Sequence, residues 1–335
     1  MSFPHFMAAA LYDPQEGYYA RPAGQVGRGG DFFTSVSAGP LFGRLLAECV
    51  LEWYYEAVMP PRWRLIEVGA NDGSLASDLH AALRGMDVEL GGMEHVVIEP
   101  LPQLATALRE KCGDFLGVVD SAEVLADDPL PSFVLGNEVL DALPFHLIES
   151  DGRAWQELGV TLEGGTFAWT GIGPVAPELV KGIPVFPAGY RTEVRGNFRD
   201  FLAPLVAAMG RGRMLWIDYG FPRDDYYHES RTTGTLRTFS RHRAAEDPLQ
   251  SPGEIDITAH VDFTAVEEAV RGLGGKVLLF ERQGRFLTNY ARPWLTSMEG
   301  WTDAEAMKAV RAFQTLTHPG QLGASFHMMM AEWAG

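Results

Sequence analysis

Cysteine is nearly absent from this sequence, and its scarcity excludes several kinds of chemistry. Only Cys49 and Cys112 occur among 335 residues, so at most one disulfide can form and no cysteine-rich metal site is available. Both thiols are expected to be buried. The nine histidines are scattered, without an HExxH motif or another paired ligand spacing. We therefore expect no bound metal.

Positive charge is also scarce. The chain has 27 Lys and Arg against 44 Asp and Glu, a formal net charge of −17, and no run of basic residues. A general nucleic-acid binder needs a basic stripe to neutralise phosphates, so we expect no nucleic-acid partner. The acidic surplus is typical of a soluble protein, and it would also attract a cationic substrate.

Long apolar runs and several enzyme motifs are missing as well. No window of about 18 apolar residues exists, so neither a membrane span nor a membrane partner is expected. The first twenty residues lack the basic start and apolar core of a signal peptide, which favours a cytoplasmic protein. GxSxG and GxxxxGK[ST] are absent, and this disfavours a serine hydrolase of the α/β type and a P-loop.

What is present is an alternation of apolar strands and amphipathic helices. With 46% hydrophobic residues the chain can bury a sizeable core. Strands separated by helices predict an α/β fold with a mostly parallel sheet covered on both faces. Strands are predicted at the segment that ends at Glu67 and at 95–100, 115–120, 132–139, 213–220, 276–290 and 326–333. Helices are predicted over 40–58, from Ser74, and over 102–111, 198–209, 263–273 and 304–316.

The corner after the first strand has the features of a nucleoside-binding site. Gly69 and Gly73 let the backbone pass close to a ligand with positive φ, and the helix that follows points free N–H groups at the turn. Glu67 can accept a hydrogen bond from a ligand ammonium, and Glu99 can grip two ribose hydroxyls. The turn lacks GxGxxG, which favours S-adenosylmethionine over a dinucleotide. An ordinary strand–turn–helix corner with an incidental acid remains the alternative.

A longer set of motifs resembles the MidA family of class I methyltransferases. In order from Leu11 to Leu287 these are LYDPQEGYYA, GDFFTSVSAGPLFG, IEVGANDGSL, NEVLDALPFH, IDYGF, TGTLRTF, PGEIDITAHVDFT and QGRFL. The resemblance covers nearly the whole chain. It implies a Rossmann-like sheet of seven strands with helices on both faces, and S-adenosylmethionine as cofactor. That family includes a mitochondrial complex I assembly factor that methylates a protein arginine, so an arginine acceptor is also implied.

The resemblance suggests how the chain is divided and also shows one departure. Residues 1–60 are expected to form an N-terminal arm and a helix that cover the site. Residues 61–335 would form the methyltransferase domain, with insertions at about 150–195 and 223–258, the first containing a hairpin. The family's turn usually reads Gly-Pro-Gly-Arg-Gly, whereas this chain has Asn71 at the central glycine. Asparagine tolerates unusual φ better than most residues.

The acceptor is expected beside the end of the 132–139 strand. A guanidinium needs carboxylates that orient it, hold its charge and take a proton. Glu138 and Asp141 supply carboxylates, and Asn137 adds a carbonyl that can serve acceptor or cofactor. We predict that these three residues bind the reacting nitrogen. The alternative is that Glu138 or Asp141 caps a following helix.

Further candidates lie just before the predicted 40–58 helix and near residue 260. Asp31 and Thr34 resemble the family's N-terminal cover and are expected to contact the cofactor. His260 is a candidate proton relay, because its unperturbed pKa lies near neutrality. Asp262 is expected to cap the next helix.

Three functional hypotheses remain open at this stage. The first is a methyltransferase that modifies a protein arginine during assembly of a larger complex. The second keeps methyl transfer but takes a small biosynthetic intermediate as acceptor. The third is an assembly or scaffold protein that retains the fold without catalysis, for which the change at Asn71 gives some ground. The sequence also leaves a homodimer open.

Overall fold

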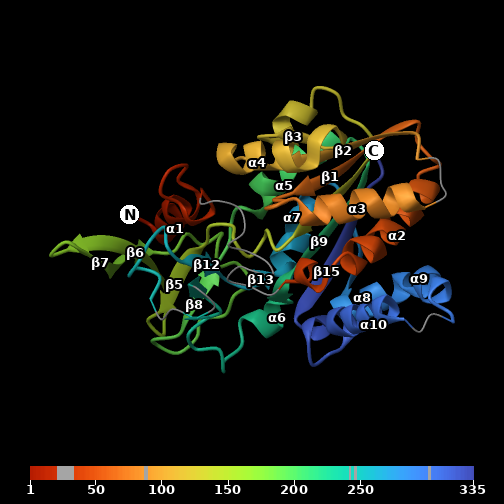
Figure 1. Ribbon diagram of the computed structural model, residues 1–335. Coiled ribbons are helices and arrows are strands. Elements are labelled where there is room, and N and C mark those ends of the chain that lie inside the picture. Colours follow the sequence, from red (N-terminus) through yellow and green to blue (C-terminus); the bar gives the residue numbers. More distant parts are fainter. Residues whose placement is uncertain (21–33, 87–89, 241–242, 245–246, 301–302) are drawn as a thin grey trace. The chain divides into compact units, whose positions relative to one another are not determined.

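The structure, a computed structural model, describes residues 1–20, 34–86, 90–240, 243–244, 247–300 and 303–335 (Figure 1). The chain forms two compact units, each assembled from three segments. Unit 1 consists of Met1–Pro22, Val139–Leu202 and Gly220–Ala269, and unit 2 of Ala23–Glu138, Ala203–Tyr219 and Val270–Gly335. None of the described helices is long and apolar enough to cross a membrane.

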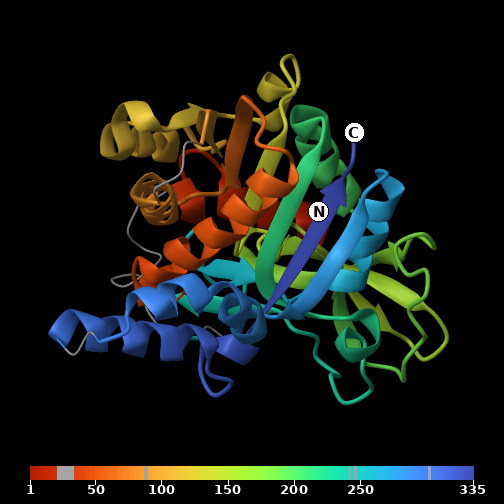
Figure 2. The same cartoon turned by 90° about the vertical axis from the view of Figure 1, so that its right-hand side faces the viewer.

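Unit 2 is built on a sheet with the order β14-β15-β9-β4-β1-β2-β3. Its five strands from β9 to β3 run parallel, while β15 is antiparallel to both of its neighbours. Figure 2 shows β9, β15 and β14 beside one another. The predicted seven-stranded α/β sheet is thereby confirmed. The bounds are β1 Arg62–Val68, β2 Gly92–Ile98, β3 Gly117–Val119, β4 Ser132–Asn137, β9 Gly212–Phe221 (its last two residues in unit 1), β14 Lys276–Arg282 and β15 Phe326–Trp333.

Helices cover this sheet because its strands are apolar on both faces. Leu65 and Ile66 are neighbours on β1 and point to opposite faces, yet both are fully buried. On one face, Leu65 belongs to a core that includes Leu46 of α2 and Leu79 of α3. The helices are α2 Leu41–Glu56, α3 Ser74–Gly85, α4 Pro102–Cys112, α8 Gln283–Tyr290, α9 Arg292–Ser297 and α10 Ala304–Thr317, with α5 Phe198–Met209 and α7 Phe263–Gly272 shared between the units. Short 3-10 turns occur at Val36–Ala38, Gly113–Phe115, Ala122–Leu125 and Leu322–Ala324.

The strand predicted over 276–290 is half wrong. Strand β14 ends at Arg282 and α8 begins at Gln283. Phe286, Leu287 and Tyr290 follow helical spacing, and the first two are fully buried. Gly284 fits only because it has no side chain: a Cβ there would lie 2.3 Å from the Thr317 carbonyl oxygen. The apolar run of β14 therefore passes into a helix without an intervening turn signal.

Unit 1 contains the predicted hairpin within a larger antiparallel sheet of order β7-β6-β5-β8. The hairpin turns at Gly164 and Gly165, which have φ of 59° and 89°, the positive angles that a tight two-residue turn requires. A second sheet has the order β11-β10-β12. The bounds are β5 His146–Ser150, β6 Trp155–Glu163, β7 Thr166–Pro174, β8 Arg191–Val194, β10 Arg237–Ser240, β11 Arg243–Ala244, β12 Asp256–Thr258, β13 Val261–Asp262, α1 Phe3–Tyr12, a 3-10 turn Tyr18–Ala20 and α6 Arg223–Tyr226.

The N-terminal motif packs within unit 1. Tyr19 donates a hydrogen bond to Asp256 Oδ1 at 2.8 Å, and a Cβ at Gly253 would lie 2.3 Å from the Glu16 carbonyl oxygen. Two motifs far apart in sequence, LYDPQEGYYA and PGEIDITAHVDFT, are therefore joined. The compact units divide the predicted 1–60 segment, because α1 belongs to unit 1 and α2 to unit 2. The role of this segment as a cover over the site stays a prediction.

Candidate functional site

The turn after β1 has the backbone that the sequence predicted. Gly69, Asn71 and Gly73 have φ of 67°, 49° and 72°, all in the left-handed region that favours glycine. A Cβ at Gly73 would lie 2.8 Å from Leu108 Cδ2, so glycine is also needed there for packing. Asparagine is among the few other residues that enter this region readily. The turn therefore keeps its shape with Asn71 at its centre.

Glu67 carries an unsatisfied buried carboxyl oxygen. The residue is 2% exposed, and its Oε2 has no hydrogen-bond partner among the described residues. Burial raises the pKa of Glu67 to about 8, and the charges of Asp72 and Asp78 add to the rise. A buried acceptor left without a partner is costly. A cationic donor placed at this oxygen would remove that cost and ionise the carboxyl group.

Glu99 lies beside the same turn. Val68 of β1 pairs with Ile98 of β2, and Gly69 N donates to the Ile98 carbonyl oxygen at 3.2 Å, so Gly69 and Glu99 follow adjacent strand ends. Glu99 Oε1 accepts a hydrogen bond from Leu101 N at 2.9 Å. Burial raises the pKa of Glu99 to about 7, although the hydrogen bond from Leu101 opposes the rise. The β1–β2 register therefore places Gly69 and Glu99 at the same edge of the sheet.

Asn137 ends the neighbouring strand β4 at the same edge, and Glu138 follows it. Glu138 has φ of 55°, which is strained for a glutamate, and its N–H donates to the Ile217 carbonyl oxygen at 2.9 Å. Asn137 Nδ2 donates to Glu138 Oε1 at 3.1 Å. Asn137 Oδ1 is buried without a partner among the residues that the structure describes. This strand end therefore presents oxygen acceptors and suits a ligand rich in N–H donors.

Of the two N-terminal candidates, only Thr34 can be placed. Its N–H and its Oγ1 both lie 3.2 Å from Ser37 Oγ, and the residue is 5% exposed. These contacts stabilise the turn that leads into α2. Asp31 lies outside the described residues. The cofactor contacts of Asp31 and Thr34 stay predictions.

Asp141 belongs to unit 1, where Arg195 organises its surroundings. Arg195 donates to the carbonyl oxygens of Asp141 at 2.5 Å, Ala259 at 2.9 Å and His260 at 2.7 Å. Burial raises the pKa of Asp141 to about 6, and the charge of Arg195 opposes the rise. The helix-capping alternative for Glu138 and Asp141 is wrong, because residues 138–145 contain no helix and lead into β5.

The pKa of His260 differs from the near-neutral value on which its predicted role depends. Burial lowers its pKa to about 4, and the nearby Arg231, Arg237 and Arg195 contribute to the drop. Its ring stacks on Phe221 with centroids 5.2 Å apart. His260 is therefore neutral at pH 7, and the near-neutral pKa on which the proton-relay argument depended is wrong.

Asp262 caps α7 as predicted. Its Oδ1 accepts hydrogen bonds from Thr264 N at 3.0 Å and Ala265 N at 3.2 Å. Its Oδ2 forms an ion pair with Arg223 Nε at 3.1 Å. Both carboxyl oxygens are thus engaged in structural contacts.

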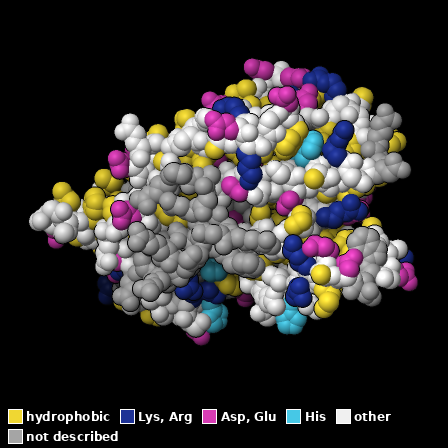
Figure 3. Space-filling model, viewed as in Figure 1, with side chains coloured by type: hydrophobic (Ala, Val, Ile, Leu, Met, Phe, Trp, Pro, Cys, Tyr) yellow, Lys and Arg dark blue, Asp and Glu magenta, His cyan; other side chains and the backbone are white. Residues whose placement is uncertain are grey.

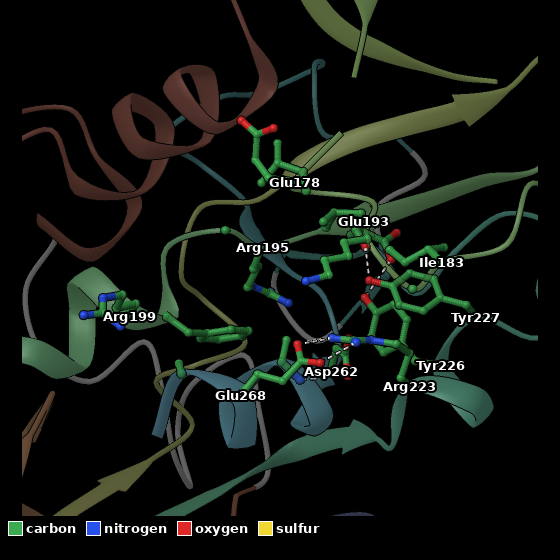
Figure 4. Close-up of a pocket in the computed structure, with 18 residues that line it drawn as sticks. Glu178, Ile183, Glu193, Arg195, Arg199, Arg223, Tyr226, Tyr227, Asp262 and Glu268 are labelled. Atoms are coloured by element: carbon green, nitrogen blue, oxygen red, sulfur yellow. Dashed lines mark hydrogen bonds and ion pairs between the residues drawn. The ribbon is translucent and has the colours of Figure 1, made fainter. Parts of the chain in front are cut away.

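Sequence reasoning missed a cavity of about 560 Å³ within unit 1 (Figure 4). Its wall includes the buried residues Glu193 and Arg195. Glu193 accepts hydrogen bonds from Thr235 N at 3.0 Å and Leu236 N at 2.8 Å, and a Cβ at Gly234 would come within 2.2 Å of its Oε1. The TGTLRTF motif therefore wraps around a carboxylate 40 positions earlier. Only the folded chain brings these segments together, so spacing gave no signal.

Comparison with known proteins decides the family. Residues 45–280 match the model of a family described as "putative S-adenosyl-L-methionine-dependent methyltransferase", which covers more than half of the chain. The chain belongs to this methyltransferase family. A crystal structure of a COG1565 superfamily member from Burkholderia thailandensis, bound to S-adenosyl-homocysteine, is 33% identical, with a TM-score of 0.89 over 99% of this chain and 88% of that one.

Curated relatives of the methyltransferase carry a more specific name. The protein arginine methyltransferase NDUFAF7 of Danio rerio is 29% identical over 79% of this chain and 67% of its own length. The Drosophila melanogaster homologue is 26% identical over 97% and 79%. The resemblance to the MidA family is confirmed, and S-adenosylmethionine is the cofactor of this methyltransferase.

The residues at the carboxyl edge of unit 2 fit that cofactor. The unpartnered oxygen of Glu67 suits its ammonium group, and the buried carboxyl group of Glu99 suits two ribose hydroxyls. The left-handed turn from Gly69 to Gly73 lets backbone come close to a ligand. These assignments remain our predictions for the individual residues.

Proposed function

We propose that this methyltransferase transfers a methyl group to a guanidinium nitrogen of a protein arginine. The observation that carries the proposal is the strand end at Asn137 and Glu138, which offers an unpartnered amide oxygen beside a carboxylate. A guanidinium has five N–H donors and a charge that a carboxylate matches. The names of the curated relatives support the same acceptor.

The roles follow from the chemistry of the transfer. When bound, S-adenosylmethionine supplies a methyl group whose bond to sulfur breaks as the new carbon–nitrogen bond forms. Asn137 and Glu138 orient the accepting nitrogen, which is the main requirement of a direct displacement. The nitrogen also loses one proton, and we assign Glu138, the carboxylate at this strand end, to receive it.

The strained backbone of Glu138 supports a functional role. A non-glycine residue at φ of 55° costs about 1–3 kcal/mol and persists only where its surroundings enforce it. The hydrogen bond from its N–H to Ile217 fixes this conformation. Such strain gathers at functional sites, where it aims a side chain that a relaxed backbone would direct elsewhere.

The test uses labelled S-adenosylmethionine with a lysate of the source cells. We expect label in a protein band and methylarginine after acid hydrolysis of that band. Glu138→Gln should lower the transfer rate by at least about 100-fold, since it removes an acid–base group, while calorimetry still detects cofactor binding. Label that enters only a small molecule would contradict the arginine acceptor, and undiminished turnover in the variant would contradict the role of Glu138.

A further inference from the structure

Lys111 lies near the end of α4, and its ammonium group forms three hydrogen bonds with the segment from Asp72 to Ser74. Its Nζ donates to the Asp72 carbonyl oxygen at 2.6 Å, to Asp72 Oδ2 at 2.9 Å and to Ser74 Oγ at 3.2 Å. An ammonium has three donors, so all three are used within a three-residue segment. The side chain is 46% exposed, and burial therefore does not force these contacts.

Asp72 is the centre of this arrangement. Its Oδ1 accepts from Ser74 N at 3.0 Å, and its Oδ2 accepts from Ser74 Oγ at 2.7 Å. Partial burial acts to raise the pKa of Asp72, but the hydrogen bonds from Ser74 and Lys111 outweigh it and hold the pKa below its ordinary value. Asp72 is therefore a carboxylate at neutral pH, with Lys111 as its counter-ion.

Helix α4 also packs directly on the turn. A Cβ at Gly73 would lie 2.8 Å from Leu108 Cδ2 and 3.0 Å from Cys112 Sγ. Leu108 and Cys112 thus lie under the turn, and Lys111 reaches it from the exposed side. The same helix starts just after Glu99, whose Oε1 accepts from Leu101 N. One helix consequently joins the two halves of the cofactor corner.

We propose that Lys111 is a positioning residue for S-adenosylmethionine, which acts by holding the Gly69–Gly73 turn and neutralising Asp72 beside Glu67. The charged groups that act on Glu67 are Asp72 in the turn and Asp78 on α3, and both disfavour its ionised form. Without Lys111 the charge of Asp72 acts in full, and Glu67 becomes harder to ionise when it meets a ligand ammonium. The turn also loses its ion pair with a cation. The inference depends on the cofactor and not on the arginine acceptor.

The first test measures cofactor affinity of the full-length Lys111→Met variant by calorimetry between pH 6 and pH 9. We expect the Kd for S-adenosylmethionine to rise about three- to tenfold at pH 7, the range of a partly exposed ion pair with added hydrogen bonds. The pH at which affinity is half its maximum should move upward. The melting temperature of the ligand-free variant should change little, because partly exposed pairs contribute little to stability.

Two variants control this measurement. Lys308→Met removes the same charge from an exposed position on α10, and its Kd should match that of the wild type. Lys111→Arg keeps the charge and should restore most of the affinity. If Lys111→Met binds as tightly as the wild type, or if Lys308→Met shows the same loss, the proposal is overturned. A lower melting temperature with unchanged Kd would also overturn it, since that result indicates a structural role alone.

The second test separates neutralisation from a general loss of packing. In an Asp72→Asn background the charge that Lys111 neutralises is gone, so adding Lys111→Met should weaken binding by less than half as much as it does in the wild type. The upward shift of the pH profile should disappear as well. An equal loss in both backgrounds would contradict the pairing of Lys111 with Asp72. Because calorimetry requires no acceptor, failure of the arginine hypothesis leaves this result interpretable.

Discussion

Glu67 shows how burial can prepare a single side chain for a ligand. Its carboxyl group is buried, one oxygen has no partner among the described residues, and its pKa is raised to about 8. The folded, ligand-free protein therefore keeps a proton that the unfolded chain releases above its ordinary pKa. The contribution of Glu67 to the free energy of unfolding therefore falls as pH rises from about 4.5 to about 8. The fall is at most about 1.4 kcal/mol per pH unit.

The Glu67→Gln variant tests this account at both ends of that pH range. At pH 8.5 the ligand-free variant should be more stable than the wild type, because glutamine has no charge to desolvate. At pH 5 the two should differ little. Chemical denaturation at the two pH values measures the difference. Calorimetry should show that S-adenosylmethionine binds about 10- to 100-fold more weakly to the variant, which lacks a charged acceptor. A variant less stable than the wild type at pH 8.5 would contradict the account.

At the residue scale, the sequence predicted positions better than protonation states. Gly69 and Glu99 were predicted to lie close together because strand ends of a parallel sheet lie at one edge, and the β1–β2 register places both just after adjacent strand ends. The pKa of His260 could not be predicted, because burial in the folded chain lowers it and the charges of three arginines from other segments add to the drop. The ion pair between Lys111 and Asp72 was missed for the same reason, since it joins residues 39 positions apart.

At the scale of elements, the contact between α2 and α3 depends on one glycine. A Cβ at Gly43 of α2 would lie 2.6 Å from Asp78 Cβ and 3.1 Å from the Asp78 carbonyl carbon on α3. Real Cβ atoms do not come that close, and the obstacle is partly backbone that cannot move aside. Helix α3 starts at the cofactor turn, so its placement also fixes the turn.

Gly43→Ala should therefore destabilise unit 2 by about 1–3 kcal/mol, the usual effect of overpacking. Gly85, at the end of α3, is the matched control: a Cβ there would meet nothing within 4 Å. Gly85→Ala should be neutral or slightly stabilising, because alanine favours a helix more than glycine does. Thermal unfolding of both variants gives the comparison. Equal stability of the two variants would show that the helices can separate at little cost.

Elements with a clear period were predicted well from the sequence, and their boundaries less so. Helices α3 and α4 begin where Ser74 and Pro102 indicated, since a glycine turn and an X-Pro step mark helix starts physically. The 276–290 segment was predicted as one strand because the apolar strand β14 continues directly into helix α8. In unit 1 the hairpin was found from its Gly-Gly turn, whereas the pairing of β5 with β8 joins residues more than 40 positions apart and has no local signal.

At the scale of the whole molecule, net charge is the property that should affect the acceptor most. The chain carries −17, and on the face in Figure 3 acidic side chains are spread among neutral and basic ones. A net negative charge attracts cationic peptides from a distance. Salt weakens this attraction, because the Debye length is about 10 Å at 0.1 M. The proposed arginine acceptor is a cation, so the proposal implies a dependence on salt.

Raising NaCl from about 20 mM to about 300 mM should lower kcat/KM several-fold for an arginine peptide flanked by lysines. The same peptide flanked by glutamates should show no such loss, since the acidic chain repels it at low salt. Initial rates with labelled cofactor at saturating S-adenosylmethionine measure both. An identical salt response of the two peptides would exclude steering by the charge of the chain.

Cofactor binding should depend most on the corner formed by the Gly69–Gly73 turn and the carboxyl groups of Glu67 and Glu99. Calorimetric titration with S-adenosylmethionine at pH 7.5, on the wild type and on Glu99→Gln, tests it most directly. We predict one binding site per chain in the wild type and an affinity at least about tenfold lower in the variant, which loses its bidentate acceptor. Equal affinity in the two proteins, or no binding to the wild type, would contradict the account.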